Sequence, residues 1–130
     1  MGEVMNSDVV IFDIQAYEIT DVSEQIHSAN KKWWTDMDPK NPKDVTVKLA
    51  LVVTEVSEAI EGVRKGLMDD KLPQYEMVDV EIADAIIRLL DLAGARGIDI
   101  GWIIRDKLNY NAVRVDHTQE HRDAEGGKKF

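Results

Sequence analysis

Two similar stretches of sequence decide the fold: residues 52–63 read VVTEVSEAIEGV, and residues 78–89, which follow 26 positions later, read VDVEIADAIIRL. Each contains an apolar stripe at intervals of three and four residues, the period of a helix with one buried face. Each also contains two carboxylates three residues apart, Glu55 with Glu58 and Glu81 with Asp84. At about 100° per residue, the carboxylate stripe lies roughly 130° from the apolar centre. We therefore expect two helices whose apolar stripes pack the core and whose carboxylates occupy a second face.

Capping and turn residues bound four expected helices, so the predicted fold class is all-α. Asn41 suits an N-cap, Pro42 suits the first helical position, and Gly66 suits the residue after the last turn. Apolar residues at positions 22, 26, 29 and 33 predict an earlier helix that places Trp33 in the core. The four helices are expected over residues 21–34, 42–65, 73 to the 94–97 region, and 99–113.

The remaining segments lie at the two ends of one predicted domain that covers residues 1–130. In the arm formed by residues 1–19, the apolar run at residues 9–12 fits either a strand or a packed extended segment. The polar segment 116–130 is expected to be a mobile tail. No segment suggests a linker between two domains.

Composition excludes several classes of function. The formal net charge is −9, and no basic stripe is visible, which argues against generic binding to nucleic acid. No apolar run approaches the roughly 20 residues of a membrane span, and the N-terminus lacks the pattern of a secretory signal. The absence of cysteine excludes thiolate chemistry and fits a reducing cytoplasm. An acidic protein can still bind an anionic substrate if metal ions bridge the two.

The paired carboxylates indicate what such a metal would be. Residues three apart on a helix are neighbours, and two carboxylates so close repel each other unless a cation lies between them. Two such helices packed together would bring four carboxylates to one point. That number of hard oxygen ligands suits Mg²⁺, with Mn²⁺ as a substitute. The expected ligands are therefore Glu55, Glu58, Glu81 and Asp84.

Other interpretations of these residues remain open at this point. Acidic pairs on exposed helices are common and usually belong to a solvated face. An acidic helical bundle that serves as an adaptor or interaction protein, without catalysis, would explain the helices and the charge but not the matching phase of the carboxylates. A di-iron site would need histidine three residues after a ligand glutamate, and neither Glu55 nor Glu81 has one. His27 is expected to be a surface or capping residue.

At these residues the sequence resembles the MazG-like, all-α nucleoside triphosphate pyrophosphohydrolases. The signature of that family, Glu-x-x-Glu followed after a spacer by Glu-x-x-Asp, stands here at residues 55–58 and 81–84. Residues 107–111, KLNYN, are similar to the Lys and Asn element on the last helix of the family. The closing residues 126–130, GGKKF, are similar to the end of short phage-type members. The likeness covers roughly residues 22–114 and that ending.

The resemblance implies a fold, an assembly and an activity. It implies a four-helix bundle that forms a homodimer or homotetramer and holds Mg²⁺ at the four carboxylates named above. It implies hydrolysis of a standard or modified (d)NTP to (d)NMP and pyrophosphate in nucleotide-pool control, in a host cytoplasm if a phage encodes the chain. Apolar residues on the far side of the third helix, Val80, Ile87 and Leu90, also suggest burial against a partner subunit.

Two further groups of residues are candidates for binding the nucleotide. Lys107, Asn111 and Arg114 lie one helical turn apart on one face, and we expect them to contact phosphate. Trp34 ends the first helix, where an indole can stack on a nucleobase, and Lys31 and Asn30 could then supply hydrogen bonds to the base. Because lysine favours the O6 and N7 acceptors of guanine, a purine is expected, with dGTP or GTP ahead of adenine nucleotides.

Overall fold

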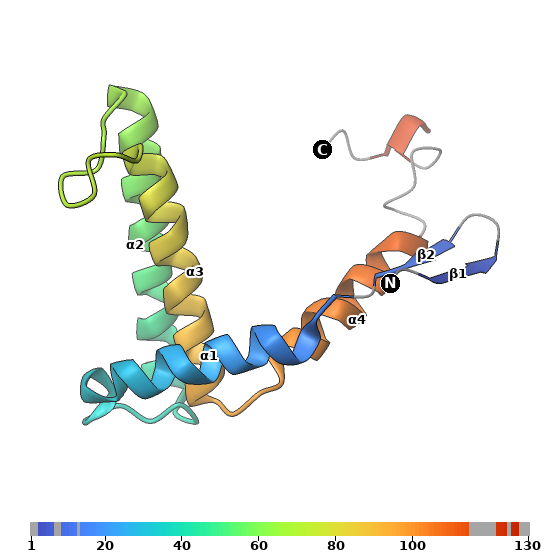
Figure 1. The fold of residues 1–130 in the computed structure, drawn as a ribbon, viewed down its shortest axis with the longest axis horizontal. Coiled ribbons are helices and arrows are strands. Elements are labelled where there is room, and N and C mark those ends of the chain that lie inside the picture. Colours follow the sequence, from blue (N-terminus) through green and yellow to red (C-terminus); the bar gives the residue numbers. More distant parts are fainter. Residues whose placement is uncertain (1–2, 7–8, 13, 115–121, 125, 128–130) are drawn as a thin grey trace. The chain divides into compact units, whose positions relative to one another are not determined.

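The structure is a computed structural model that describes residues 3–6, 9–12, 14–114, 122–124 and 126–127. Four α-helices lie in this part of the chain (Figure 1), so the all-helical class is confirmed. They are α1 Ala16–Asn30, α2 Pro42–Lys65, α3 Met77–Ala95 and α4 Ile100–Val113, and a 3₁₀ helix, η1, covers Lys31–Trp34. The chain forms two compact units, Met1–Thr20 with Asp99–Phe130 and Asp21–Ile98, and each is described by itself. The predicted tail falls largely outside the described residues.

The ends of α2 follow from its sequence. The Asn41 side chain accepts hydrogen bonds from the backbone N–H groups of Lys43 and Asp44, at 2.9 and 3.3 Å. At the other end, Gly66 has a φ of 61°, the left-handed conformation that glycine adopts without steric cost. Its N–H donates a hydrogen bond to the carbonyl oxygen of Val63, which lies in the last turn of the helix. Both boundaries predicted from these caps are confirmed.

The third helix begins later than its sequence suggests, at Met77 rather than at Pro73. The reason is a compact loop built around Asp69, whose buried side chain accepts from the N–H groups of Lys71 and Leu72 at 3.0 and 2.8 Å. The backbone N–H of Asp69 also donates to the carbonyl of Tyr75. These bonds satisfy the backbone in a turn, so a helix does not form there.

The first unit joins a hairpin to α4. Strands β1 (Glu3–Asn6) and β2 (Val9–Ile11) pair in antiparallel fashion, so the apolar run at residues 9–12 is a strand up to Ile11. The N–H of Phe12 donates to Asn109 Oδ1 on α4 at 2.6 Å. Near the start of α4, Gly101 lies against the backbone of Ala16 so closely that a Cβ at this position would collide with it.

In the second unit, α2 and α3 lie side by side and antiparallel (Figure 1), and the residues between them are small or acidic. From α2 the buried residues are Glu55, Ala59 and Gly62, and from α3 they include Glu81 and Ala85. A Cβ added at Gly62 would come within 3.0 Å of Met77, so the helices approach closely there. The carboxylate stripes therefore face each other, as their shared phase requires, and the prediction that the apolar stripes pack the core is wrong for these two helices.

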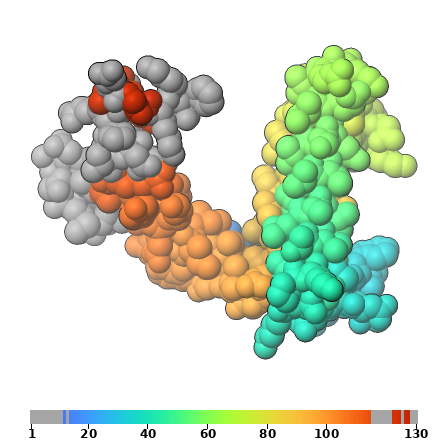
Figure 2. Space-filling model, turned by 180° about the vertical axis from the view of Figure 1, so that it is seen from behind, coloured from blue at the N-terminus to red at the C-terminus, as the bar shows by residue number. Residues whose placement is uncertain are grey.

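The apolar stripes face outward. On α2 the stripe recurs at intervals of four and three residues, and its members are 44–63% exposed: Leu49, Val53, Val56, Ile60 and Val63. On α3 the exposed stripe comprises Ile82, Ile86 and Leu89. Figure 2 shows the outer surface of α2, in green, open along its length. Of the helices described, none is long and apolar enough to cross a membrane.

A small, polar face of α1 packs against α3. Ser23 is fully buried and donates from Oγ to the carbonyl of Leu90, while Gly94 leaves no space for a Cβ beside Ser23 and His27. Val22 and Trp33, which the apolar pattern assigned to the core, are 45% and 65% exposed. The assignment of Val22 is wrong because the buried face of α1 is set by close helix approach rather than by hydrophobicity.

Candidate functional site

Three of the four predicted metal ligands meet between α2 and α3. Carboxylate oxygens of Glu55, Glu81 and Asp84 all lie within 4.8 Å of one another. The helical phase explains this arrangement: Glu55 lies on the buried face of α2, and the two α3 residues lie three positions apart on the face opposite. Glu58, one turn beyond Glu55, is exposed and is not part of that group.

The pKa values of the three carboxyl groups are shifted in different directions. Burial, together with the neighbouring carboxylates of Glu55 and Glu58, raises the pKa of Glu81 to about 8. Burial also acts to raise the pKa of Glu55, but the protonated Glu81 and the Arg88 guanidinium outweigh it and hold that pKa below its usual range. Burial and the charge of Glu55 raise the pKa of Asp84. At neutral pH the metal-free cluster therefore keeps one proton, which resides mainly on Glu81.

The donor set fits a small divalent cation. All of its atoms are hard carboxylate oxygens, the ligands that Mg²⁺ and Mn²⁺ prefer. One of them, Glu81 Oε2, is buried and has no hydrogen-bond partner in the described part of the chain. A buried oxygen without a partner is costly unless a ligand satisfies it. The residues Glu55, Glu81 and Asp84 would hold the ion. Glu58 lies close enough to Glu81 to raise its pKa, so it borders the same site.

A cation from the chain itself already contacts the cluster. Arg88 follows Asp84 by one helical turn, and its Nε donates to Glu55 Oε1 at 2.8 Å. The Glu55 side chain is 11% exposed and the Arg88 side chain 41% exposed, so the pair lies at the edge of the cluster rather than deep inside it. Arg88 thereby connects the carboxylates to the space beside them.

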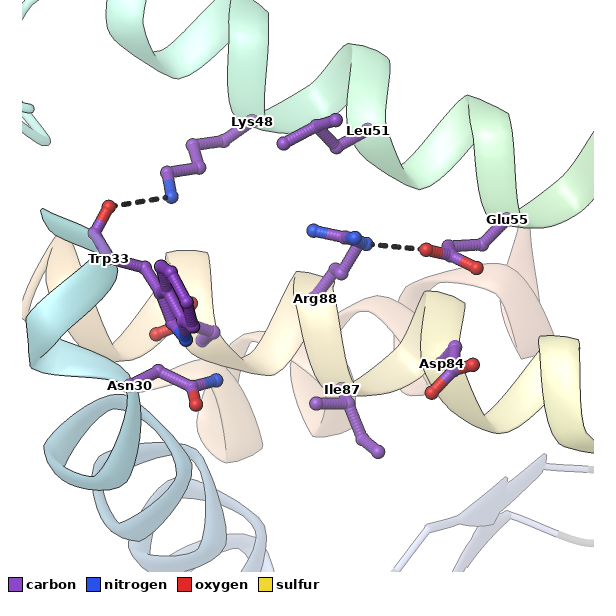
Figure 3. A pocket seen from close by; sticks show the side chains of 9 residues that line it. Asn30, Trp33, Lys48, Leu51, Glu55, Asp84, Ile87 and Arg88 are labelled. Atoms are coloured by element: carbon purple, nitrogen blue, oxygen red, sulfur yellow. Dashed lines mark hydrogen bonds and ion pairs between the residues drawn. The ribbon is translucent and has the colours of Figure 1, made fainter. Parts of the chain in front are cut away.

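That space is a cavity of about 590 Å³. Figure 3 shows its walls, with Glu55, Asp84 and Arg88 at one end and Trp33, Asn30 and Lys48 at the other. Leu51, Ile87 and Asp91 complete the lining. The cavity therefore places an acidic, metal-binding end beside an end that offers an indole, an amide and an ammonium group.

The two adjacent tryptophans occupy places opposite to those predicted. Trp33 lines the cavity and is 65% exposed, whereas Trp34 is buried, with 8% exposed. The helix tightens from α to 3₁₀ at Lys31, which changes the angle between successive side chains from about 100° to about 120°. A stripe extended at the α-helical angle therefore assigns the pair wrongly. Lys48 fixes the arrangement, since its Nζ donates to the Trp33 carbonyl and lies 4.3 Å from the Trp34 ring centre.

Asp91 anchors this end of the cavity. Its buried carboxylate accepts from the Trp34 indole N–H, which lies 3.2 and 3.1 Å from the two oxygens, and from His27 Nδ1 at 2.9 Å. The His27 and Trp34 rings meet edge to face, with centroids 5.5 Å apart. His27 is thus an internal hydrogen-bond donor rather than the surface or capping residue that the sequence suggested. Asp91 holds η1 against α3 and so places Trp33 at the cavity wall.

Replacing Asp91 by alanine is expected to lower the free energy of unfolding by about 2–3 kcal/mol, because it leaves the buried Trp34 N–H without an acceptor. Chemical denaturation followed by tryptophan fluorescence measures the change. Asp79→Ala, which removes an exposed carboxylate from the same helix, serves as the matched control. Equal unfolding midpoints for the two variants would show that the Asp91 contacts contribute nothing.

Of the remaining predicted site residues, only Asn30 is among the residues that line this cavity. Lys31 is exposed. Lys107 and Asn111 lie on α4 in the first unit, and Arg114 is its C-cap residue; the cations of Lys107 and Arg114 lie 4.9 and 5.8 Å from the Tyr110 ring centre. Asn111 Oδ1 is buried without a hydrogen-bond partner in the described structure. Their phosphate-binding role stays a prediction.

The sequence contained a signal for the residues that were missed. Lys48 precedes Leu51 and Glu55 at intervals of three and four residues, and Arg88 and Asp91 continue the series from Asp84 in the same way. Extending each carboxylate stripe by one or two turns therefore finds Lys48, Arg88 and Asp91 in the cavity wall. The sequence prediction followed each stripe only as far as its carboxylates.

Comparison of this chain with protein-family models, with curated proteins and with solved structures finds no match.

Proposed function

We propose that this protein is a Mg²⁺-dependent nucleoside triphosphate pyrophosphohydrolase of the MazG-like kind, which converts a (d)NTP and water to (d)NMP and pyrophosphate in the cytoplasm. One observation carries the proposal: three carboxylates converge within 4.8 Å, one of their oxygens is buried without a partner, and the group opens into a cavity with an exposed indole. Acidic residues on a merely solvated face do not bury themselves against each other. The cost of doing so is explained if a cation completes the site.

The residues of the chain have distinct roles in this proposal. Glu55, Glu81 and Asp84 would hold a magnesium ion, which would supply a Lewis acid for the phosphoryl oxygens. Glu58 is the exposed member of the set, so it is the one placed to orient the attacking water and accept its proton. The bond between the α- and β-phosphoryl groups breaks, and pyrophosphate leaves. Lys107 and Asn111 of α4, with Arg114 at its C-cap, remain the candidates for binding phosphate.

The nucleoside is proposed to occupy the far end of the cavity. Trp33 offers the exposed indole face there, and it takes the stacking role that the sequence suggested for Trp34. Asn30 and Lys48 line the same end and can donate hydrogen bonds to acceptor-rich base edges. Lys48 therefore replaces Lys31 as the basic residue for the base. A purine, with guanine ahead of adenine, remains the expected preference.

Replacing Trp33 by leucine is expected to raise KM for the preferred nucleotide by about tenfold or more with little change in kcat, because stacking of a base on an indole contributes about 1–3 kcal/mol. Trp34→Phe is the matched variant: it removes the bond to Asp91 and should lower the unfolding midpoint instead. Steady-state kinetics with the full nucleotide panel measures the first effect. An unchanged KM for every nucleotide in Trp33→Leu would remove Trp33 from the binding site.

The proposed assembly is a homodimer or homotetramer. Its support is the outward apolar stripe of α2, which continues on α3 and gives the regular spacing of a helix-packing face. A second copy of the chain is the proposed cover. Light scattering at micromolar concentration is expected to give the mass of two or four chains, and Ile60→Asp, which places a charge in the stripe, should reduce it. A monomeric wild-type mass would contradict this assembly.

The activity itself is tested with eight nucleotides, four ribo and four deoxy, by following pyrophosphate release with Mg²⁺ or with EDTA. We expect monophosphate and pyrophosphate in equal amounts with Mg²⁺ and neither product with EDTA. Release of inorganic phosphate and a diphosphate would exclude this reaction. No turnover of any nucleotide would favour the alternative, an acidic helical adaptor protein.

A further inference from the structure

Arg88 has no assigned part in the reaction, yet it is the residue that joins the two ends of the cavity. Its Nε bonds to Glu55, and in Figure 3 the rest of its guanidinium points away from that carboxylate toward the end lined by Lys48. Within the described residues, the two terminal nitrogens of Arg88 have no hydrogen-bond partner. Arg88 thus uses one edge of its guanidinium and presents the other to the cavity.

The bond to Glu55 stands where a metal ligand bond is expected. Glu55, Glu81 and Asp84 repel one another when ionised, and the positive charge of Arg88 reduces that repulsion. A divalent cation at the cluster would bind Glu55 itself and would repel the guanidinium. The cation and Arg88 therefore compete for one carboxylate. Since Arg88 is 41% exposed and follows Asp84 on the same helix face, its side chain can leave Glu55 without a change in the backbone.

We propose that Arg88 holds the place of the metal ion: its guanidinium neutralises Glu55 while no divalent cation is bound, and it turns to a phosphate oxygen of the ligand once the cation has taken that carboxylate. A planar guanidinium with two unpaired terminal nitrogens is suited to bidentate contact with phosphate. The identity of the phosphate ligand rests on the proposed function, whereas the competition with the cation does not.

Two binding measurements test the two halves, and both use the intact chain. In the first, isothermal titration with Mg²⁺ alone compares wild type with Arg88→Gln. Loss of the competing cation should tighten Mg²⁺ binding about tenfold. Lys48→Gln is the matched control, because it removes the same charge from the same cavity without touching a carboxylate. A change within twofold for Arg88→Gln, or an equal change in both variants, would overturn the competition.

In the second measurement, inorganic pyrophosphate is titrated in saturating Mg²⁺. Arg88→Gln should weaken its binding by about tenfold or more, so the variant gains affinity for the cation and loses affinity for the anion. Arg88→Lys keeps the charge but not the planar fork, and it should restore Mg²⁺ affinity to the wild-type value more fully than pyrophosphate affinity. Weaker binding of both ligands in Arg88→Gln would mean that Arg88 is only structural. If wild type binds Mg²⁺ as expected but never pyrophosphate, the proposed function fails together with the phosphate half, and the competition stands.

Discussion

Replacing Glu81 by glutamine is expected to reduce Mg²⁺-dependent turnover by at least about 10³-fold while making the metal-free protein more stable than wild type at pH 7, because glutamine is neutral in both the folded and the unfolded chain. The two effects separate because of the raised pKa of Glu81, about 8, which keeps this side chain protonated and neutral in the metal-free state. Glutamine has the shape of the neutral acid and carries no charge. It therefore replaces the resting form well but cannot provide the carboxylate that a metal ion requires.

The control is the same chemical change at an exposed position on the same helix. Glu76 is exposed at the N-cap of α3 and makes no capping bond with its side chain, so Glu76→Gln should leave turnover near wild type. Denaturant unfolding with EDTA and pyrophosphate release with Mg²⁺ measure the two properties on the same samples. If Glu81→Gln, Glu58→Gln and Asp84→Asn all keep near-wild-type rates, the reaction takes place elsewhere.

The metal-free protein is expected to lose stability as pH rises from 6 to 8.5, by about 2 kcal/mol. The sign follows from Glu81. Its pKa is 4.5 in the reference state and about 8 in the folded chain, so between these values the folded state holds a proton that the unfolded state has released. That contribution to stability is full below pH 4.5 and is lost as pH passes through 8. The lowered pKa of Glu55 adds stability that is constant over this window, because it changes only at more acidic pH.

Magnesium should reverse this dependence. Binding of the cation requires Glu81 to give up its proton, so Mg²⁺ affinity should rise between pH 6 and 8.5, and binding at pH 7 should release a proton. Denaturant unfolding at three pH values, with EDTA and with Mg²⁺, measures both slopes. Glu81→Gln should abolish the loss of stability with rising pH that wild type shows in EDTA. Stability that is independent of pH in wild type, with or without the metal, would show that Glu81 is an ordinary exposed acid.

The sequence predicted the helices of the second unit and three carboxylates of its site. Asn41 and Gly66 have local chemistry that determines the two ends of α2, and each works without any tertiary contact. The shared phase of the carboxylates on the two helices depends only on helical geometry. For that reason Glu55, Glu81 and Asp84 could be brought together before the structure was known.

The sequence did not reveal which face of each helix is buried against another helix. Apolar stripes usually mark the core of a chain, and here Val53 and Ile60 face outward while Ala59 and Gly62 allow α2 to approach α3 closely. A sequence pattern records that a residue is suited to burial, but it does not record whether its own chain supplies the cover. The same limit explains the start of α3, where the side chain of Asp69 satisfies a turn that propensity alone would extend into helix.

The tryptophan pair was assigned wrongly for a related reason. The change from α1 to η1 at Lys31 rotates the following side chains, and Asp91, 57 positions after Trp34, then selects which indole is buried. A bond across that sequence separation has no local signal. Trp33 is left at the cavity wall as a result.

The central claim is that Glu55, Glu81 and Asp84 form a divalent cation site. A crystal structure with Mn²⁺, analysed by the anomalous scattering of the metal, tests it most directly. We expect a peak between α2 and α3 about 2.1–2.2 Å from oxygens of all three carboxylates, with Arg88 no longer bonded to Glu55. A crystal that contains Mn²⁺ at other positions but none at these three residues would contradict it.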